Sequence, residues 1–302
     1  RVAGVCFLII AVGDPLLKLL LMTLGTTLSG RPSTVGAARR CLLTVRVISK
    51  WASPMYLFLL ALHCQLLIMN VPPVLLTHTV LDIGWAGYTI FCVTNMISAV
   101  AIPMPEERDR ASRPLPHWTG WTKHGFQGSV ALAGLIYLVL LFWGLSVPTF
   151  TFQDPQIWGM STATKAAINR EVSLLDCMAA LLQRVLHSWQ VITFFAFLIF
   201  LILVLVVPVV DILALVTTVH HAVNGNRQLV RWSISVSRIA RHCSGVDVLI
   251  VGTYLAQVAG FLYVGAGLQL LLVAEVIRYA LTYLIVEMAV DVDDNEGERP
   301  KN

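Results

Sequence analysis

The sequence predicts an all-helical, multi-pass membrane bundle, and two observations carry this prediction. Hydrophobic residues make up 57% of the 302 residues and charged residues only 13%, with a mean hydropathy of +0.77. This composition is far more apolar than that of an ordinary water-soluble domain. Apolar runs of about 20 residues, the length that crosses a hydrocarbon core, also recur along the chain. They lie at 3–28, 54–71, 76–102, 127–150, 189–219, 245–262 and 266–290.

These runs predict about seven transmembrane helices, or six if 245–262 and 266–290 form one span. Lysine and arginine concentrate in alternate connections, and basic loops are retained in the cytoplasm. The basic loops are at 29–50, 103–125 and 220–244, whereas those at 70–76, 151–188 and 263–267 carry few basic residues or none. We therefore expect the N-terminus outside and the C-terminus in the cytoplasm.

Two segments share one degenerate pattern, in which a proline-broken apolar helix is followed by a basic amphipathic stretch and a second apolar helix. The first segment runs from Pro15 to Gly87 and the second from Pro208 to Gly267. A charged residue follows the proline at the third position in each, Lys18 in the first and Asp211 in the second. Such internal repeats are typical of membrane transport proteins.

The repeat pattern divides the chain into four parts. Residues 1–102 form the first membrane repeat, 103–125 a proline-rich cytoplasmic linker, 126–290 the second repeat and 291–302 an acidic tail. The second repeat opens with the apolar run at 127–150, and the first repeat has no counterpart of it. We therefore expect the first repeat to be N-terminally truncated, with the missing helix before residue 1.

The second repeat also contains an expected extramembrane helix near 166–188. Apolar residues recur there at alternating steps of four and three, which places them on one helix face. This apolar stripe comprises Ile168, Val172, Leu175, Ala179, Leu182 and Leu186. It predicts a helix of about six turns that either packs on the membrane domain or presents an apolar ridge to a partner protein.

Ionisable residues inside the predicted spans are candidates for function, because inserting each charge costs about 2.5–3.5 kcal/mol. They are Asp14, Lys18, Asp82, Asp211, Asp247, Glu275 and Arg278. Asp14 can pair with Lys18, and Glu275 with Arg278, since the members of each pair share one helix face. Two alternatives are open for these charges. They neutralise one another in pairs near the head groups, or they line a proton or cation pathway.

Asp211 has no basic neighbour on its own helix. Pro208, three residues earlier, removes a backbone donor and frees a carbonyl one turn before it. We therefore expect a cross-repeat contact between Asp211 and Lys18 in this polar opening.

A basic amphipathic stretch in the second repeat predicts an interfacial helix. Its basic stripe falls within an arc of about 80° and lies opposite Leu229, Trp232 and Ile239. The stripe consists of Arg227, Arg231, Arg238 and Arg241, and Arg39, Arg46 and Lys50 form a similar stripe in the first repeat. Such a helix lies in the head-group plane and turns its basic residues towards anionic lipid. Retention of basic loops in the cytoplasm would by itself explain why arginines occur in this stretch. It would not explain the apolar face.

Short motifs recur at the starts of the helices. Pro15-Leu16-Leu17-Lys18-Leu19 opens one repeat, and Gly84-Trp85-Ala86-Gly87-Tyr88 starts a later helix. A second motif is divided between the copies: the first has Trp51, Ser53, Met55 and Phe58, and the second has Ser244, Asp247 and Val248. Together these motifs resemble the P-L-L-K-L and W-S-M-x-D-V-F patterns of the paraquat-inducible protein A family. Tyr56 replaces the acid in the first copy, and His242 replaces the tryptophan in the second.

This resemblance implies a component of lipid transport or membrane-lipid homeostasis in a bacterial inner membrane, with membrane lipids and a separate lipid-carrying protein as its partners. The cysteine-rich zinc ribbons that bacterial members commonly carry have no counterpart here. A secondary transporter of a small solute or ion is the alternative, because duplicated halves and charged spans fit it equally. A seven-helix receptor also fits the span count, although the repeat speaks against it.

Other function classes find little support in the sequence. No serine, histidine or carboxylate spacing forms a nucleophile set, so we do not expect an enzyme. The six cysteines are scattered without metal-ligand spacing, and we expect neither a metal nor another cofactor. Nucleic-acid binding is not expected either, because the net charge of +4 is modest and its arginines sit at predicted membrane edges.

Overall fold

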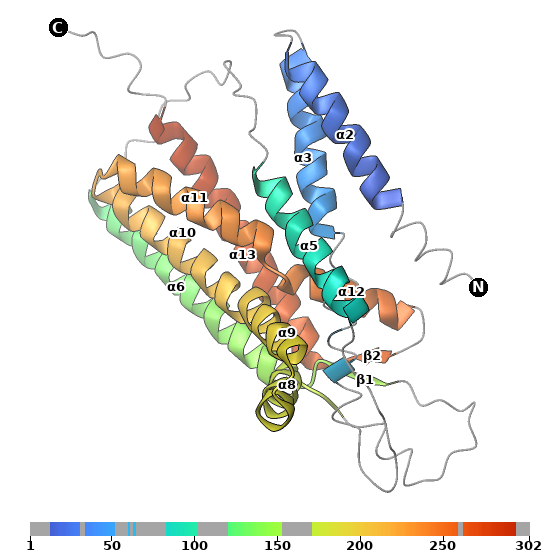
Figure 1. Ribbon diagram of the computed structural model, residues 1–302. Coiled ribbons are helices and arrows are strands. Elements are labelled where there is room, and N and C mark those ends of the chain that lie inside the picture. The colour runs from blue at the N-terminus through green and yellow to red at the C-terminus, as the bar shows by residue number, and fades with distance from the viewer. Residues whose placement is uncertain are drawn as a thin grey trace, which may run out of the picture.

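The computed structural model describes residues 13–30, 34–51, 60, 63–64, 83–101, 120–152, 171–258 and 262–293. These residues form a bundle of helices with one small sheet (Figure 1). The helices are α2 (Asp14–Ser29), α3 (Val35–Trp51), α5 (Ile83–Ala101), α6 (Gly120–Ser146), α8 (Leu174–Ser188), α9 (Val191–Leu201), the π-helix η4 (Ile202–Val206), α10 (Val207–Val223), α11 (Arg227–Cys243), α12 (Val246–Val258) and α13 (Ala266–Asp293). The predicted helical class is confirmed for this part of the chain.

A two-stranded antiparallel sheet is the exception to the all-helical prediction. Strand β1 (Phe150–Phe152) follows α6 and pairs with β2 (Leu262–Val264), which precedes α13. The sheet therefore holds the end of α6 beside the start of α13.

Three helical segments are long and apolar enough to cross a membrane. By their length and composition, they confirm three of the predicted spans. They are His124–Ser146 in α6, Val191–Val223 through α9, η4 and α10, and Ala266–Ile285 in α13. The described part of α12, Val246–Val258, is about 20 Å long and shorter than a hydrocarbon core of about 30 Å, so the predicted span at 245–262 is not confirmed. The count of seven is not confirmed, and most of 54–71 falls outside the described residues.

Pro208 shapes the longest apolar segment. The π-helix η4 lies directly before α10, where Pro208 cannot donate to a carbonyl one turn earlier. The carbonyl of Leu203 instead accepts a hydrogen bond from the backbone N–H of Gly245, at 3.0 Å. The polar backbone opening predicted at Pro208 is therefore present, and the turn between α11 and α12 occupies it.

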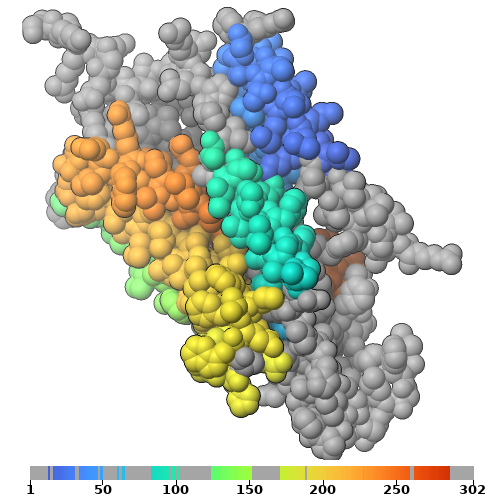
Figure 2. Space-filling model, in the orientation of Figure 1, coloured from blue at the N-terminus to red at the C-terminus, as the bar shows by residue number. Residues whose placement is uncertain are grey.

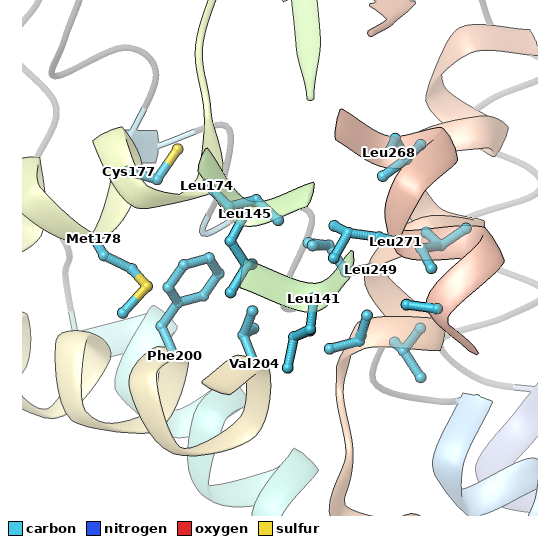
Figure 3. Close-up of a cluster of buried hydrophobic side chains, with 14 of the residues drawn as sticks. Leu141, Leu145, Leu174, Cys177, Met178, Phe200, Val204, Leu249, Leu268 and Leu271 are labelled. Atoms are coloured by element: carbon cyan, nitrogen blue, oxygen red, sulfur yellow. The ribbon is translucent and has the colours of Figure 1, made fainter. Parts of the chain in front are cut away.

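The apolar core lies where α6, α13, α12 and the α8–α9 hairpin converge (Figure 3). Leu141 and Leu145 of α6 lie between Phe200 of α9 and Leu271 of α13. Gly144 permits the close approach of α6 and α13, since a Cβ there would lie 2.8 Å from the Leu271 side chain. Small residues at such contacts are typical of helices packed within membranes.

Helix α8 begins later than predicted and buries a different face. The chain is not helical at Val172, which bridges to Phe150, so the helix predicted near 166–188 is wrong for the described residues 171–173. Leu182 and Leu186 of the predicted stripe are 42% and 64% exposed. The buried face consists of Leu174, Cys177, Met178, Leu181 and Val185. Helix α8 packs on α9 and α6 through this face. Both faces of the helix are apolar, so periodicity alone could not tell which one is buried.

We expect Ser173→Ala to destabilise α8 by about 1 kcal/mol. The Ser173 hydroxyl accepts a hydrogen bond from the Asp176 backbone N–H (3.1 Å), and the Asp176 carboxylate accepts from the Ser173 N–H (3.0 Å). These reciprocal bonds satisfy two N–H groups that the first turn leaves without partners. Thermal unfolding should show a lower midpoint for Ser173→Ala than for Ser235→Ala, an exposed serine within α11. Equal midpoints would show that the cap contributes nothing.

Two helical hairpins, α2–α3 and α10–α11, belong to the two predicted repeats. Helix α3 packs on α5, and α11 contacts both α5 and α3. Figure 2 shows α5, in teal, lying between the blue α2–α3 hairpin and the orange α11. The α2–α3–α5 unit therefore meets the second half of the chain at α11.

Candidate functional site

A buried ion-pair cluster joins α10 and α13. Arg278 Nη1 donates to Asp211 Oδ2 at 2.9 Å, while its Nε and Nη2 donate to Glu275 Oε2 at 2.8 and 2.5 Å. The exposed fractions of Asp211, Arg278 and Glu275 are 0, 1 and 3%. The predicted pairing of Glu275 with Arg278 is confirmed. A single guanidinium therefore binds two carboxylates, away from solvent.

Neighbouring helices extend this cluster. The Ser237 hydroxyl of α11 donates to Asp211 Oδ1 at 2.5 Å. On α12, Asp247 accepts from the Tyr279 hydroxyl at 2.8 Å and from the Val248 backbone N–H at 3.0 Å. The Arg278 guanidinium also lies 5.2 Å from the centre of the Tyr279 ring, within the range of a cation–π contact. Asp211, Asp247 and the predicted Glu275–Arg278 pair thus come together from three helices.

Tyr137 of α6 is a member of this cluster that the sequence did not reveal. Its side chain is fully buried, and its hydroxyl has no hydrogen-bond partner among the described residues. It interacts electrostatically with Glu275, Arg278 and Asp211. A buried hydroxyl without a partner costs about 1–3 kcal/mol, so Tyr137 adds a polar group that a small polar ligand or water would satisfy. An apolar run offers no periodicity that distinguishes a core tyrosine from one in a site.

The cluster lies near the middle of the candidate spans. Tyr137 is about 13 Å along α6 from Ser146, and Glu275 is about 13 Å along α13 from Ala266. These two helix ends lie together, because β1 and β2 pair beside them. The middle of a hydrocarbon core of about 30 Å is about 15 Å from its edge. Ionisable groups at such a depth mark functional sites in membrane proteins.

Lys18 does not meet Asp211, so the predicted cross-repeat contact is wrong. Lys18 Nζ donates to the Asn95 carbonyl (3.2 Å), to Asn95 Oδ1 and to Ser98 Oγ (3.0 Å) on α5. Asn95 Nδ2 in turn donates to the Ser49 carbonyl of α3 at 3.2 Å. Each charge contacts the later helix of its own half, because the two proline-containing helices belong to separate hairpins.

The two polar contacts occupy corresponding positions in the two repeats. Lys18 follows Pro15 as Asp211 follows Pro208, at the third residue. When Gly87 is matched with Gly267, Asn95 falls on Glu275 and Ser98 on Arg278. Lys18 therefore contacts Ser98 in the first half, and Asp211 contacts Arg278, the matching position, in the second. This correspondence supports the internal duplication, with the charge reversed between the halves.

The amphipathic pattern predicted that this helix lies in a head-group plane, across the bundle. Helix α11 instead runs back along α10. Its inner face packs against α10, and Ser237 places it level with Asp211. Trp232 and Ile239 remain 66% and 50% exposed on a second face. The basic residues form a third face of α11, on which Arg231 and Arg238 are exposed and Arg241 is half-buried. The side chain of Arg227 is outside the described part.

One arginine on α3 and one on α11 have lowered pKa values. Burial lowers the pKa of Arg46 on α3, and the nearby Arg238 lowers it further. Burial also lowers the pKa of Arg241, against the effect of Asp211, while Arg278 and Arg238 lower it further. Both shifts arise because charged guanidinium groups are moved out of water next to like charges.

The other predicted site residues have simpler roles or lie outside the described structure. Ser244 is 1% exposed and ends α11, and its backbone N–H donates to Ala240 at 2.8 Å. Pro15 lies in the first turn of α2 and Trp51 ends α3. The side chains of Asp14, Pro15 and Trp51 and all of Ser53 are outside the described part. Among the described residues, no three His, Cys, Asp or Glu side chains are grouped to hold a metal ion.

The chain matches no protein-family model, no curated protein and no solved structure.

Proposed function

We propose that this protein is an integral membrane component of a lipid-handling system, in which α11 contacts an anionic lipid. The observation that carries the proposal is the position of α11, whose basic and apolar faces lie side by side next to the buried cluster. Arg238 is exposed on one face, and Trp232 and Ile239 are exposed on the other. A lipid needs both surfaces, since its head group is charged and its chains are apolar.

The connection between α11 and the cluster supports a role beyond passive lipid contact. Ser237 lies on the inner face of the same helix and donates directly to Asp211. A movement of α11 would therefore break or re-form a hydrogen bond to a buried carboxylate. The motif resemblance to the paraquat-inducible protein A family points in the same direction, and it adds a separate lipid-carrying protein as the proposed partner.

A secondary transporter of a small solute or ion is the second candidate. It is favoured by the cluster itself, where Asp211, Glu275 and Arg278 lie at mid-span with the Tyr137 hydroxyl beside them. Charged groups at this depth commonly form ion or proton pathways. Lipid handling is preferred because α11 places an exposed basic face beside an exposed apolar face.

Native mass spectrometry with lipid extraction tests the proposal. We expect the purified wild type to retain phospholipid, and the double variant Trp232→Ser, Ile239→Ser to retain several-fold less, because it removes apolar contacts with the chains. Leu186→Ser is the matched control, since Leu186 is 64% exposed on α8, a different part of the surface. Wild type without phospholipid, or equal loss in the control, would favour the transporter.

A further inference from the structure

Tyr137 of α6 lies level with Arg278 of α13. A Cβ at Gly144 of α6 would lie 2.8 Å from the Leu271 side chain of α13. The two helices are antiparallel, because the end of α6 lies beside the start of α13. Seven residues before Gly144 is Tyr137, and seven residues after Leu271 is the arginine. Seven residues fall within about 20° of two full turns, so Tyr137 faces α13 as Gly144 does.

Tyr137 also lies level with Asp211 of α10. A Cβ at Gly134 of α6 would lie 3.2 Å from the side chains of Ile212 and Val216 on α10. Helices α6 and α10 are antiparallel, since a hydrogen bond joins the early part of α6 to the late part of α10. One turn beyond Gly134, Tyr137 is therefore level with the turn of α10 that contains Asp211.

The Tyr137 hydroxyl thus faces the ion-pair cluster with a hydrogen-bonding group that is not in use. The side chain is fully buried, and the hydroxyl has no hydrogen-bond partner among the described residues. A tyrosine hydroxyl both donates and accepts hydrogen bonds, and leaving it unpaired away from water is costly. The site therefore has capacity for one further hydrogen bond at this point.

Among the described residues, the charged groups around the cluster include one acid more than bases. The titratable side chains come from five helices: Tyr137 of α6, Asp211 of α10, Arg241 of α11, Asp247 of α12, and Glu275, Arg278 and Tyr279 of α13. Three of these are acids and two are bases, and tyrosine is neutral at ordinary pH. An uncompensated carboxylate away from water is costly, and it takes up a proton instead of remaining charged. The cluster therefore has room for one proton.

We propose that the cluster is a proton-binding site, in which Glu275 carries one proton at neutral pH. Arg278 donates to Glu275 only through Oε2, so a proton on Oε1 leaves both of these bonds in place. Asp211 accepts at both of its oxygens, from Ser237 and Arg278, which suits an ionised carboxylate. A protonated carboxyl group has one O–H donor, and Tyr137 supplies the acceptor. Tyr137 is therefore a positioning residue for the proton.

The proton is connected to α11 through the same contacts. Its release from Glu275 changes the charge that Arg278 shares with Asp211, and Asp211 accepts a hydrogen bond from Ser237 of α11. The surface proposed to contact lipid thus lies on a helix that is bonded to the proton site. The inference goes beyond the proposed function, because the proton site stands whether or not α11 binds a lipid.

Infrared spectroscopy of the full chain in neutral detergent tests the site, since the C=O stretch of a protonated carboxyl group is separate from the bands of ionised carboxylates. We expect the wild type to show this band at neutral pH and to lose it as the pH is raised. Glu275→Gln should lack the band, because glutamine has the shape of the protonated acid but no proton to release. Glu171→Gln is the matched control and should keep it, since Glu171 is exposed and lies outside the candidate spans.

Tyr137→Phe should keep the band but shift it to higher frequency, because the carboxyl group loses its acceptor while the ring still packs. An unshifted band would show that Tyr137 is only structural. Thermal unfolding of Glu275→Gln should match the wild type, since one neutral group replaces another. A wild type with ionised carboxylates alone would overturn the proton site without any variant. A band that persists in folded Glu275→Gln would overturn the assignment to Glu275. Lipid retention is measured separately, so neither result decides the proposed function.

Discussion

Arg278→Met is expected to destabilise the protein by about 3–5 kcal/mol. Arg278 is the partner of both Asp211 and Glu275, and all three side chains are buried. Methionine fills a similar space but leaves two carboxylates without the guanidinium that neutralised them. The free energy lost comes from this uncompensated charge, since an apolar side chain is otherwise well tolerated there. Thermal unfolding in detergent, followed by size-exclusion chromatography, measures the effect.

A triple variant separates charge from packing. Asp211→Asn and Glu275→Gln, combined with Arg278→Met, remove the buried charges together and should restore most of the lost stability. Arg231→Met is the control, because Arg231 is exposed on α11 and exposed substitutions usually change stability by less than about 0.5 kcal/mol. A wild-type melting temperature for Arg278→Met alone would show that the ion pairs do not stabilise the bundle.

Periodicity and composition predicted the features that depend on one segment at a time. The spans in α6, α9–α10 and α13 follow from long apolar runs. The pairing of Glu275 with Arg278 follows from their spacing on one helix. The carbonyl freed by Pro208 also follows from local chemistry, although its partner, Gly245, does not.

Features that depend on how helices meet could not be predicted. The absence of a basic residue near Asp211 on its own helix correctly implied a partner elsewhere, but not that the partner is Arg278. Tyr137 was missed because an aromatic residue in an apolar span has the same pattern whether it faces lipid or a buried charge. Helix α8 does not pack through the predicted stripe, because Leu182 and Leu186 continue an apolar pattern that is wider than the buried surface. The alternative, an apolar ridge for a partner protein, stays a prediction.

The matched positions of the polar contacts connect these observations. Lys18 and Asp211 each contact the later helix of their own half, at positions the glycine match makes equivalent. The first half therefore has a cation held by neutral oxygens, and the second an anion held by an arginine. Helix α11 of the second half lies against α3 and α5 of the first.

Gly267→Ala should destabilise the protein by about 1–3 kcal/mol, or more if the backbone cannot move. A Cβ at Gly267 would lie 2.4 Å from the Val147 carbonyl oxygen, 2.8 Å from that of Gly144 and 2.9 Å from that of Pro148. These are backbone atoms, so no side-chain rotation can relieve the overlap. The end of α6 and the start of α13 would have to separate, which also disturbs the sheet that joins them.

The same substitution at two other glycines supplies the controls. Gly128 lies on α6 and has open space around it. Gly128→Ala should be neutral or slightly stabilising, because alanine favours a helix. Gly87, which the sequence repeat matches with Gly267, also has nothing within 4 Å of a built Cβ. Thermal unfolding should therefore distinguish Gly267→Ala from both controls. If Gly87→Ala were as harmful as Gly267→Ala, the repeated glycine would be required in both halves, and the close contact of α6 with α13 would not explain it.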